Sequence, residues 1–261
     1  MKATIYPRDV QGTGAFDGGA IVEQKPIGFP HEQSAVERVG PLFYWAWGEV
    51  PQEGAIGLHP HRGFEIMSYV LAGRAEHGDT LGTSSIVGAG GAQVMQTGSG
   101  VSHQERIIGP DAEMFQIWFE PHLSQATKRE PTYRQHEHED FPVYEGAGVT
   151  VKTVIGQDAP VELVTDVQAW DLQLEPGASH LVALPAGYAL AALAVRGGGV
   201  WTDDEGAGAT AELAAFGPRD FVVLEAGASD GRLRLDAGAD AALRMFAIAV
   251  PVAVDYPLYR K

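Results

Sequence analysis

The chain has 261 residues, which is enough for one large domain or two small ones. Its formal net charge of −16 is spread over both halves, with no cluster of lysine and arginine, so we expect no direct binding to nucleic acid or to an anionic membrane. The absence of cysteine excludes disulfides, and no run approaches the roughly 20 apolar residues of a membrane span, so we expect a cytoplasmic protein.

Glycine and proline are frequent, with 33 and 16 residues, and no long helical period is evident. This composition favours many short strands joined by tight turns, an all-β chain. Residues 1–40 are expected to form irregular strand and loop. Residues 41–50 form an aromatic strand, for which packing in a core is the favoured interpretation. The alternative is that one face of this strand walls an apolar pocket.

Two segments that follow, LHPHRGFE and GVSHQE, each carry two metal-capable side chains two residues apart. These are His59 and His61 in the first segment, and His103 and Glu105 in the second. Residues i and i+2 of a strand point to the same face, so each pair can direct both side chains into one cavity. Pro60, between the two histidines, cannot donate a ladder hydrogen bond and indicates a bulge or the first residues of a strand.

A single histidine is usually a surface residue or a satisfied core residue. The paired spacing, with glycine-rich strand and turn sequence between the pairs, favours a metal site instead. Three imidazoles and one carboxylate suit a divalent transition metal, and the thiolates of structural zinc sites are absent. Such a ligand set leaves coordination positions open, as a catalytic metal requires.

Between the two segments, residues 66–71 alternate as a buried strand, and Ala72-Gly73 is expected to form a turn before a return strand. His77, on that return strand, is not paired with another ligand candidate two residues away. It is expected to be an ordinary strand or turn residue, with a supporting role for a ligand as the minor alternative. Residues 97–100 predict a tight turn before the second pair. Residues 114–119 are expected to close a first barrel.

Another HxH pair, His136 and His138, lies among arginine, glutamine and acidic residues. A charged, solvated loop is the favoured interpretation, and a metal site the alternative. The second half repeats the pattern of short strands, at residues 149–154, 169–174, 188–195, 220–224, 233–235 and 245–250. It contains one histidine, His180, so we expect a second barrel without metal ligands. The predicted domains are residues 1–145 and 146–261.

The sequence HPHRGFE, followed by TGSGVSHQE, resembles the pirin family of the cupin superfamily, from about Gly54 to about Gln116. The resemblance implies two cupin-type, jelly-roll β-barrels in tandem, a bicupin, with metal in the first barrel only. It also implies that Glu105, and not Glu65, supplies the carboxylate ligand. Glu65 stands where many other cupins have a metal-binding glutamate.

Some pirins act as quercetin dioxygenases, which open the central ring of a flavonol with O₂ and release carbon monoxide. On this resemblance we expect one divalent metal, Fe(II) first, with Cu, Ni, Mn, Co or Zn as alternatives. The substrate would be a flavonol or another small aromatic enol, and Glu105 would serve both as ligand and as the base that takes the 3-hydroxyl proton. The alternative is a metal-dependent regulator that binds a transcription factor or metabolic enzyme, and a third option is another cupin reaction. We expect a monomer.

Overall fold

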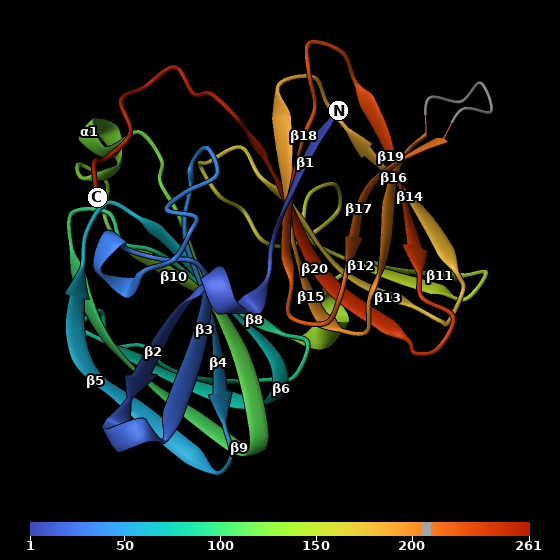
Figure 1. Cartoon of the computed structure of the whole chain (residues 1–261). Helices are drawn as coiled ribbons and strands as arrows, with labels where there is room; N and C mark the ends of the chain where they lie inside the picture. The colour runs from blue at the N-terminus through green and yellow to red at the C-terminus, as the bar shows by residue number, and fades with distance from the viewer. Residues whose placement is uncertain (205–209) are drawn as a thin grey trace. The chain divides into compact units, whose positions relative to one another are not determined.

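The computed structural model describes residues 1–204 and 210–261, which form two compact units (Figure 1). Unit 2 holds the two histidine segments and consists of Val10–Asp140, Leu163–Thr165 and Asp255–Lys261. Its strands are β2 (Gly12–Phe16), β3 (Ile21–Ile27), β4 (Leu42–Val50), β5 (Glu53–His61), β6 (Glu65–Asp79), β7 (Ser84–Gly88), β8 (Ala92–Gln96), β9 (Val101–Phe119) and β10 (Thr132–His136). Its helices are short: η2 (Asp17–Gly19), η3 (Pro30–Glu32), α1 (Leu123–Ala126) and η4 (His138–Asp140).

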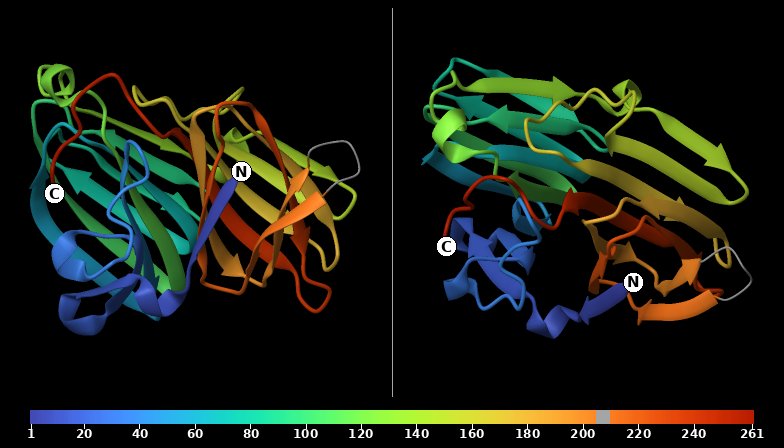
Figure 2. Two further views of the ribbon diagram at one scale, coloured as in Figure 1. Left: turned by 45° about the horizontal axis from the view of Figure 1, so that its top comes forward. Right: turned by 90° about the horizontal axis from the view of Figure 1, so that it is seen from above.

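The strands of unit 2 form one bent antiparallel sheet in the order β10-β8-β6-β9-β4-β3-β2, with β5 pairing to β9 and β7 to β6. Figure 2 shows these strands curving around a common interior. Buried side chains fill part of that interior, among them Ile21, Val70 and Met114. Trp45 and Trp47 of β4 are also fully buried, on the opposite face of the strand from Tyr44 and Ala46. The core interpretation of the aromatic strand therefore holds for these two tryptophans.

The expected turn at Ala72-Gly73 is wrong. β6 continues through this point from Glu65 to Asp79 and bends there, with shifts in its register to β9 between Val70 and Ala72 and between Ala72 and Arg74. Gly73 has φ +78°, and a Cβ there would lie 2.5 Å from the Ala112 Cβ, so the bend requires glycine. The bend replaces a turn and curves a single long strand around the interior.

Unit 1 consists of Met1–Asp9, Phe141–Glu162 and Asp166–Val254. Its strands are β1 (Lys2–Tyr6), β11 (Val143–Gly146), β12 (Val149–Ile155), β13 (Gln168–Leu174), β14 (Ser179–Leu184), β15 (Tyr188–Arg196), β16 (Gly199–Asp204), β17 (Thr210–Phe216), β18 (Phe221–Glu225), β19 (Gly231–Ala237) and β20 (Leu243–Pro251). A further short helix, η1 (Arg8–Val10), spans the passage from β1 to unit 2.

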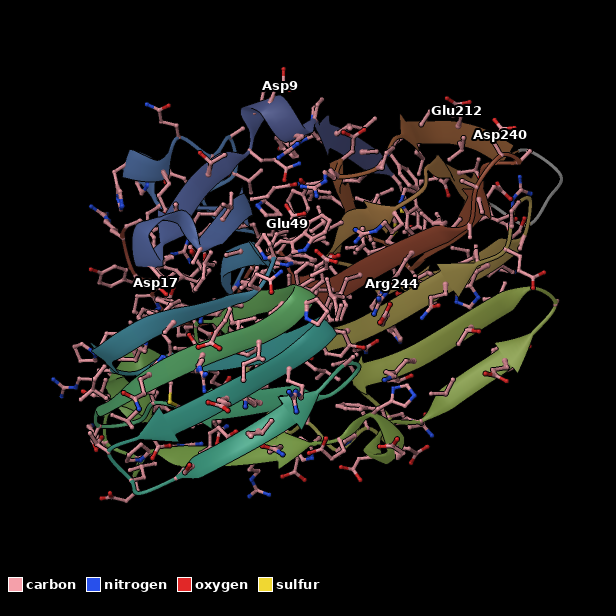
Figure 3. The ribbon with its side chains drawn as sticks, turned by 90° about the horizontal axis from the view of Figure 1, so that it is seen from below. Asp9, Asp17, Glu49, Glu212, Asp240 and Arg244 are labelled. Atoms are coloured by element: carbon pink, nitrogen blue, oxygen red, sulfur yellow. The ribbon has the colours of Figure 1, made fainter. Side chains whose placement is uncertain are left out.

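Two antiparallel sheets make up unit 1, one in the order β1-β18-β15-β20-β13-β12-β11 and one in the order β14-β19-β16-β17. An apolar cluster lies in this unit, with Trp201, Leu190 and Leu233 fully buried. On β20, the Arg244 guanidinium (labelled in Figure 3) donates to the buried Asp171 carboxylate, with Nη2 at 2.8 Å from Oδ2.

The prediction of an all-β chain is confirmed by this arrangement of strands. The division at residues 145 and 146 stays a prediction. No single cut separates the compact units, because Leu163–Thr165 also belongs to unit 2. The first nine residues belong to unit 1, and the last seven residues belong to unit 2. Among the residues described, no helix is both long and apolar enough to cross a membrane.

Candidate metal centre

Pairing between β5 and β9 brings the two sequence segments together. His59 lies opposite His103, and the register shifts between Ile56 and His59, which is the irregularity that Pro60 indicated. At the other end of β5, the Asp17 carboxylate of η2 accepts a hydrogen bond from the Ala55 backbone N–H at 3.0 Å (Figure 3 labels Asp17). This contact ties β5 to η2 in the same unit.

Three imidazoles converge as a result. The ring centroids of His59 and His103 are 4.4 Å apart, those of His59 and His61 4.8 Å, and those of His61 and His103 4.9 Å. One nitrogen of each ring lies within 4.8 Å of the others, so all three can reach a common ion. Of the two sequence pairs, the structure therefore brings both histidines of the first and the histidine of the second to one point.

The hydrogen bonding of these rings leaves lone pairs for a metal. His59 donates from Nδ1 to the Gly57 carbonyl at 2.8 Å, which leaves Nε2 unprotonated in the neutral ring. His61 Nε2 and both ring nitrogens of His103 are buried without a hydrogen-bond partner. Buried polar atoms are normally satisfied, so these orphaned nitrogens are the observation that fits a bound metal.

Electrostatics keep two of the rings neutral. Burial, followed by the neighbouring His103 and His59, lowers the pKa of His61 to about 3. Burial and the neighbouring His59 and His77 lower the pKa of His103 to about 3, against an opposing effect of Asp79. Neutral imidazole is the form that binds a metal, and three imidazoles suit Zn, Cu, Fe or Ni.

The carboxylate of Glu105 lies nearby but is not part of the three-histidine cluster found among the described residues. Glu105 is 4% exposed and accepts hydrogen bonds from Ser68 Oγ at 3.1 Å and from Gln116 Nε2 at 2.7 Å. Burial raises its pKa, while Ser68, His59 and Gln116 act in the opposite direction. The four-ligand set with Glu105 stays a prediction.

Glu65, the other carboxylate of the HPHRGFE segment, is occupied elsewhere. Its Oε1 accepts from Gln96 Nε2 and from the Val164 N–H, both at 2.7 Å. Its Oε2 accepts from the Thr165 N–H at 2.9 Å and the Thr165 hydroxyl at 2.6 Å. Glu65 thus binds the segment Leu163–Thr165 to the barrel, and both of its oxygens are used in doing so.

His77 lies closer to the cluster than an ordinary strand residue would. It is 5% exposed, its ring centroid is 5.4 Å from that of His103, and its Nε2 is 2.8 Å from Asp79 Oδ2. On its other side it stacks on Tyr133 at 4.2 Å. The minor alternative from the sequence, a supporting role beside a ligand, matches this position better than the favoured one.

Sequence reasoning missed three side chains around Glu105: Ser68, Gln116 and Trp118. They lie on β6 and β9, where apolar alternation predicted core strands, and no spacing rule marks them. The available signal was a polar residue in an otherwise apolar strand, since Gln116 interrupts the run MFQIWF and Ser68 interrupts IMSYV. The remaining HxH pair does not join the cluster, because His136 ends β10 and His138 begins η4.

A second charged group lies inside unit 2, on β3 and η3. The Lys25 side chain is 4% exposed, lies 3.0 Å from Glu23 Oε2, and also pairs with Glu32. Its ammonium is 5.7 Å from the ring centroid of Tyr44. Burial, followed by the charges of Glu23, Glu32 and Glu105, holds the pKa of Tyr44 well above its usual range. Tyr44 therefore stays protonated.

Replacing Glu23 by Gln is expected to stabilise the protein at neutral pH. Burial raises the pKa of Glu23 despite Lys25, so folding favours its protonated form. The contribution of Glu23 to the free energy of unfolding is therefore fully present below the ordinary carboxyl pKa. It is lost as the pH rises through the pKa of Glu23 in the folded protein. Glu23→Gln should raise the urea midpoint at about pH 7 and converge with wild type near about pH 4. A lower midpoint at neutral pH would show that the Lys25 pairing outweighs burial.

Comparisons with known proteins match the part of the chain that carries the three histidines. A family model described as Pirin matches residues 41–119, which include all three histidines. A pirin-like protein of Solanum lycopersicum is 29% identical over 190 residues, which cover 70% of this chain and 63% of that protein. A Pseudomonas aeruginosa protein, whose name assigns it provisionally to the quercetin 2,3-dioxygenases, is 34% identical over 194 residues, 68% of this chain and 66% of that protein. This chain thus spans about two thirds or less of these relatives.

Solved structures extend the similarity over both units. GK1651 from Geobacillus kaustophilus superposes with a TM-score of 0.77 at 22% identity, covering 99% of this chain and 100% of that one. The bacterial pirin YhhW from Escherichia coli, in complex with nickel(II), superposes with a TM-score of 0.73 at 19% identity, covering 95% and 99%. The predicted tandem cupin fold is confirmed. With the matching family model, the curated relatives and the convergent HPHRGFE histidines, this chain belongs to the pirin family.

Proposed function

We propose that this protein is a metal-dependent dioxygenase that opens the central ring of a flavonol of the quercetin type. The reaction consumes one O₂, incorporates both oxygen atoms into the ring-opened ester, and releases carbon monoxide. The observation that carries the proposal is the convergence of three imidazoles, two of which, His61 and His103, have buried nitrogens without a hydrogen-bond partner. The similarity to a protein named provisionally as a quercetin 2,3-dioxygenase supports the substrate class.

His59, His61 and His103 would hold the metal, with Glu105 as a fourth ligand from the buried side of the site. We propose Fe(II), because imidazole with carboxylate is close to the ligand set of non-haem iron oxygenases. The nickel(II) complex of a bacterial pirin supports a divalent ion and keeps nickel as an alternative. When bound, the metal supplies a Lewis acid with open positions for oxygen donors.

Glu105 can take the 3-hydroxyl proton of the flavonol. Burial raises its pKa, so its ionised form is a stronger base than an exposed carboxylate. Removal of that proton makes the flavonol electron-rich enough to react with O₂. The indole of Trp118 lies 4.8 Å from the His61 ring and stacks on Phe43, which offers aromatic surface for a planar substrate beside the ligands. An open hollow of about 460 Å³ borders His61, Val101 and Ser102.

The test loads the apo-protein with Fe(II) without oxygen, then admits air with quercetin and follows both flavonol absorbance and carbon monoxide. Absorbance loss with stoichiometric carbon monoxide is expected for wild type, and no reaction above the metal-free background is expected for His103→Ala. Metal bound normally in wild type, with no loss of any flavonol tested, would contradict the dioxygenase and leave the metal centre standing. A partner-binding regulator would then be the better hypothesis.

We propose a cytoplasmic location on the absence of cysteine. The monomeric state stays a prediction, as does the choice of flavonol among related aromatic enols.

A further inference from the structure

We propose that Trp118 and Gln116 act as a positioning pair that fixes the orientation of the Glu105 carboxylate at the metal centre. The inference rests on the proposed metal centre, but it does not depend on which substrate the centre uses. It assigns a positioning role to two side chains of β9.

The three side chains form a hydrogen-bond chain. The Trp118 indole donates from Nε1 to Gln116 Oε1 at 3.0 Å, and Gln116 donates from Nε2 to Glu105 Oε2 at 2.7 Å. Ser68 Oγ donates to the other carboxylate oxygen at 3.1 Å. Ser68 and Gln116 lie directly opposite each other on β6 and β9, so both carboxylate oxygens are held from one pair of adjacent strands.

The chemistry of these groups fixes the direction of the chain. An indole N–H can only donate, so the atom of Gln116 that faces Trp118 must be its amide oxygen. The amide nitrogen then necessarily faces Glu105. Without the indole, the Gln116 amide could rotate and place its oxygen against the carboxylate, which would remove this hydrogen bond. Trp118 thus selects the amide orientation in which Gln116 donates to Glu105.

The same indole also restrains a ligand. Its ring lies 4.8 Å from the His61 ring at 81°, an edge-to-face contact that limits rotation of the imidazole. Trp118 is itself packed against Phe43, Tyr44 and Phe64. One rigid side chain therefore orients His61 by direct contact and Glu105 through Gln116. Groups that orient metal ligands in this way typically change metal affinity by about 10–100-fold when they are removed.

The test uses Co(II), whose visible absorption reports the geometry and identity of its ligands. Wild type, Gln116→Leu, Trp118→Phe and the double variant are loaded with Co(II), and affinity is measured by competition with a chelator. Gln116→Leu is expected to weaken affinity by about 10–100-fold and to shift the visible bands. Trp118→Phe, which keeps an aromatic ring beside His61, should shift the bands in the same direction. The double variant should match Gln116→Leu alone, because the indole acts through the amide.

Trp47→Phe is the matched control. The Trp47 indole is fully buried, whereas that of Trp118 is partly buried. The Trp47 indole donates to Glu113 at 3.1 Å, outside the hydrogen-bond chain to Glu105. Trp47→Phe should retain the wild-type spectrum and affinity. This result would show that the effect of Trp118→Phe comes from losing the hydrogen bond to Gln116, and not from losing any buried indole hydrogen bond. Thermal melts of the metal-free variants verify that each is folded.

Two outcomes would overturn the inference alone: wild-type spectra in both single variants, or effects of the two substitutions that add in the double variant. Failure of wild type itself to bind Co(II), Fe(II) or Ni(II) would overturn the proposed metal centre, and the inference with it. The His103→Ala variant, which should lose binding entirely, distinguishes these cases.

Discussion

Replacing His103 by Leu is expected to abolish metal binding and, at the same time, to stabilise the metal-free protein. His103 is 2% exposed, and neither of its ring nitrogens has a hydrogen-bond partner. An unsatisfied buried polar group costs about 1–3 kcal/mol, which an apolar side chain of similar size avoids. Loss of a ligand should weaken metal affinity by more than about 100-fold, beyond the effect typical of supporting residues. Chelator competition measures the first effect and urea denaturation of the apo-protein the second.

His59→Leu is the matched control for that result. His59 is less buried, and its Nδ1 already donates to the Gly57 carbonyl, so its removal relieves no comparable penalty. It should lose metal to a similar extent without a gain in apo stability. Equal stabilisation by both variants would indicate a general effect of apolar substitution in the barrel. Unchanged metal affinity in His103→Leu would exclude His103 as a ligand.

Replacing Glu65 by Gln is expected to destabilise the protein while leaving metal affinity intact. In the Gln variant, an amide N–H₂ group would face the Thr165 N–H and the Thr165 hydroxyl, which now donate to the Glu65 carboxylate. The Thr165 hydroxyl can rotate and accept instead, but the Thr165 backbone N–H cannot. One buried donor left without an acceptor predicts a loss of about 1–3 kcal/mol in the free energy of unfolding, measured by urea denaturation.

Two further variants serve as controls for Glu65→Gln. Glu113→Gln removes a carboxylate that accepts from Trp47, and it should cost less than Glu65→Gln because the Trp47 N–H is a single donor that the Gln oxygen can still satisfy. Glu105→Gln should reverse the pattern, with weakened metal affinity. Loss of metal from Glu65→Gln at temperatures where it is fully folded would assign Glu65 to the metal centre, against the four hydrogen bonds that occupy it.

The sequence was sufficient to predict the histidine cluster because the relevant geometry is local. Residues two apart on a strand always share a face. The register of β5 against β9 then places His59 opposite His103. The aromatic run at residues 41–50 likewise located β4, and short apolar segments located β13, β15 and β20. Strands β14, β16 and β17 were not predicted. β16 begins at Gly199, in a run of glycines, and β14 carries only Val182 and Leu184 as buried apolar residues.

The environment of Glu105 could not be predicted, because it depends on curvature. Ser68 and Gln116 reach Glu105 only because β6 bends at Gly73 instead of turning there, and no local pattern distinguishes a bend from a turn at a single glycine. The role of Glu65 also depends on a distant segment, since Thr165 follows it by 100 residues. Spacing rules describe only residues that are close in the sequence, whereas the contacts of Glu105 and Glu65 depend on which distant segments lie together in the fold.

The exchange of terminal segments between the units constrains how the chain can be synthesised and dissected. β1 pairs with β18, and residues 255–261 return to the histidine barrel, where the Arg38 guanidinium donates to the Glu120 carboxylate and to the Tyr259 carbonyl. Glu120 is fully buried and also accepts from the Tyr259 N–H. During synthesis on the ribosome, the Glu120 carboxylate of the histidine barrel would therefore gain its hydrogen bond from Tyr259 only after residues 255–261 have been made. A fragment cut near residue 145 would carry a strand that belongs to the other unit and would lack the segment that seals its own.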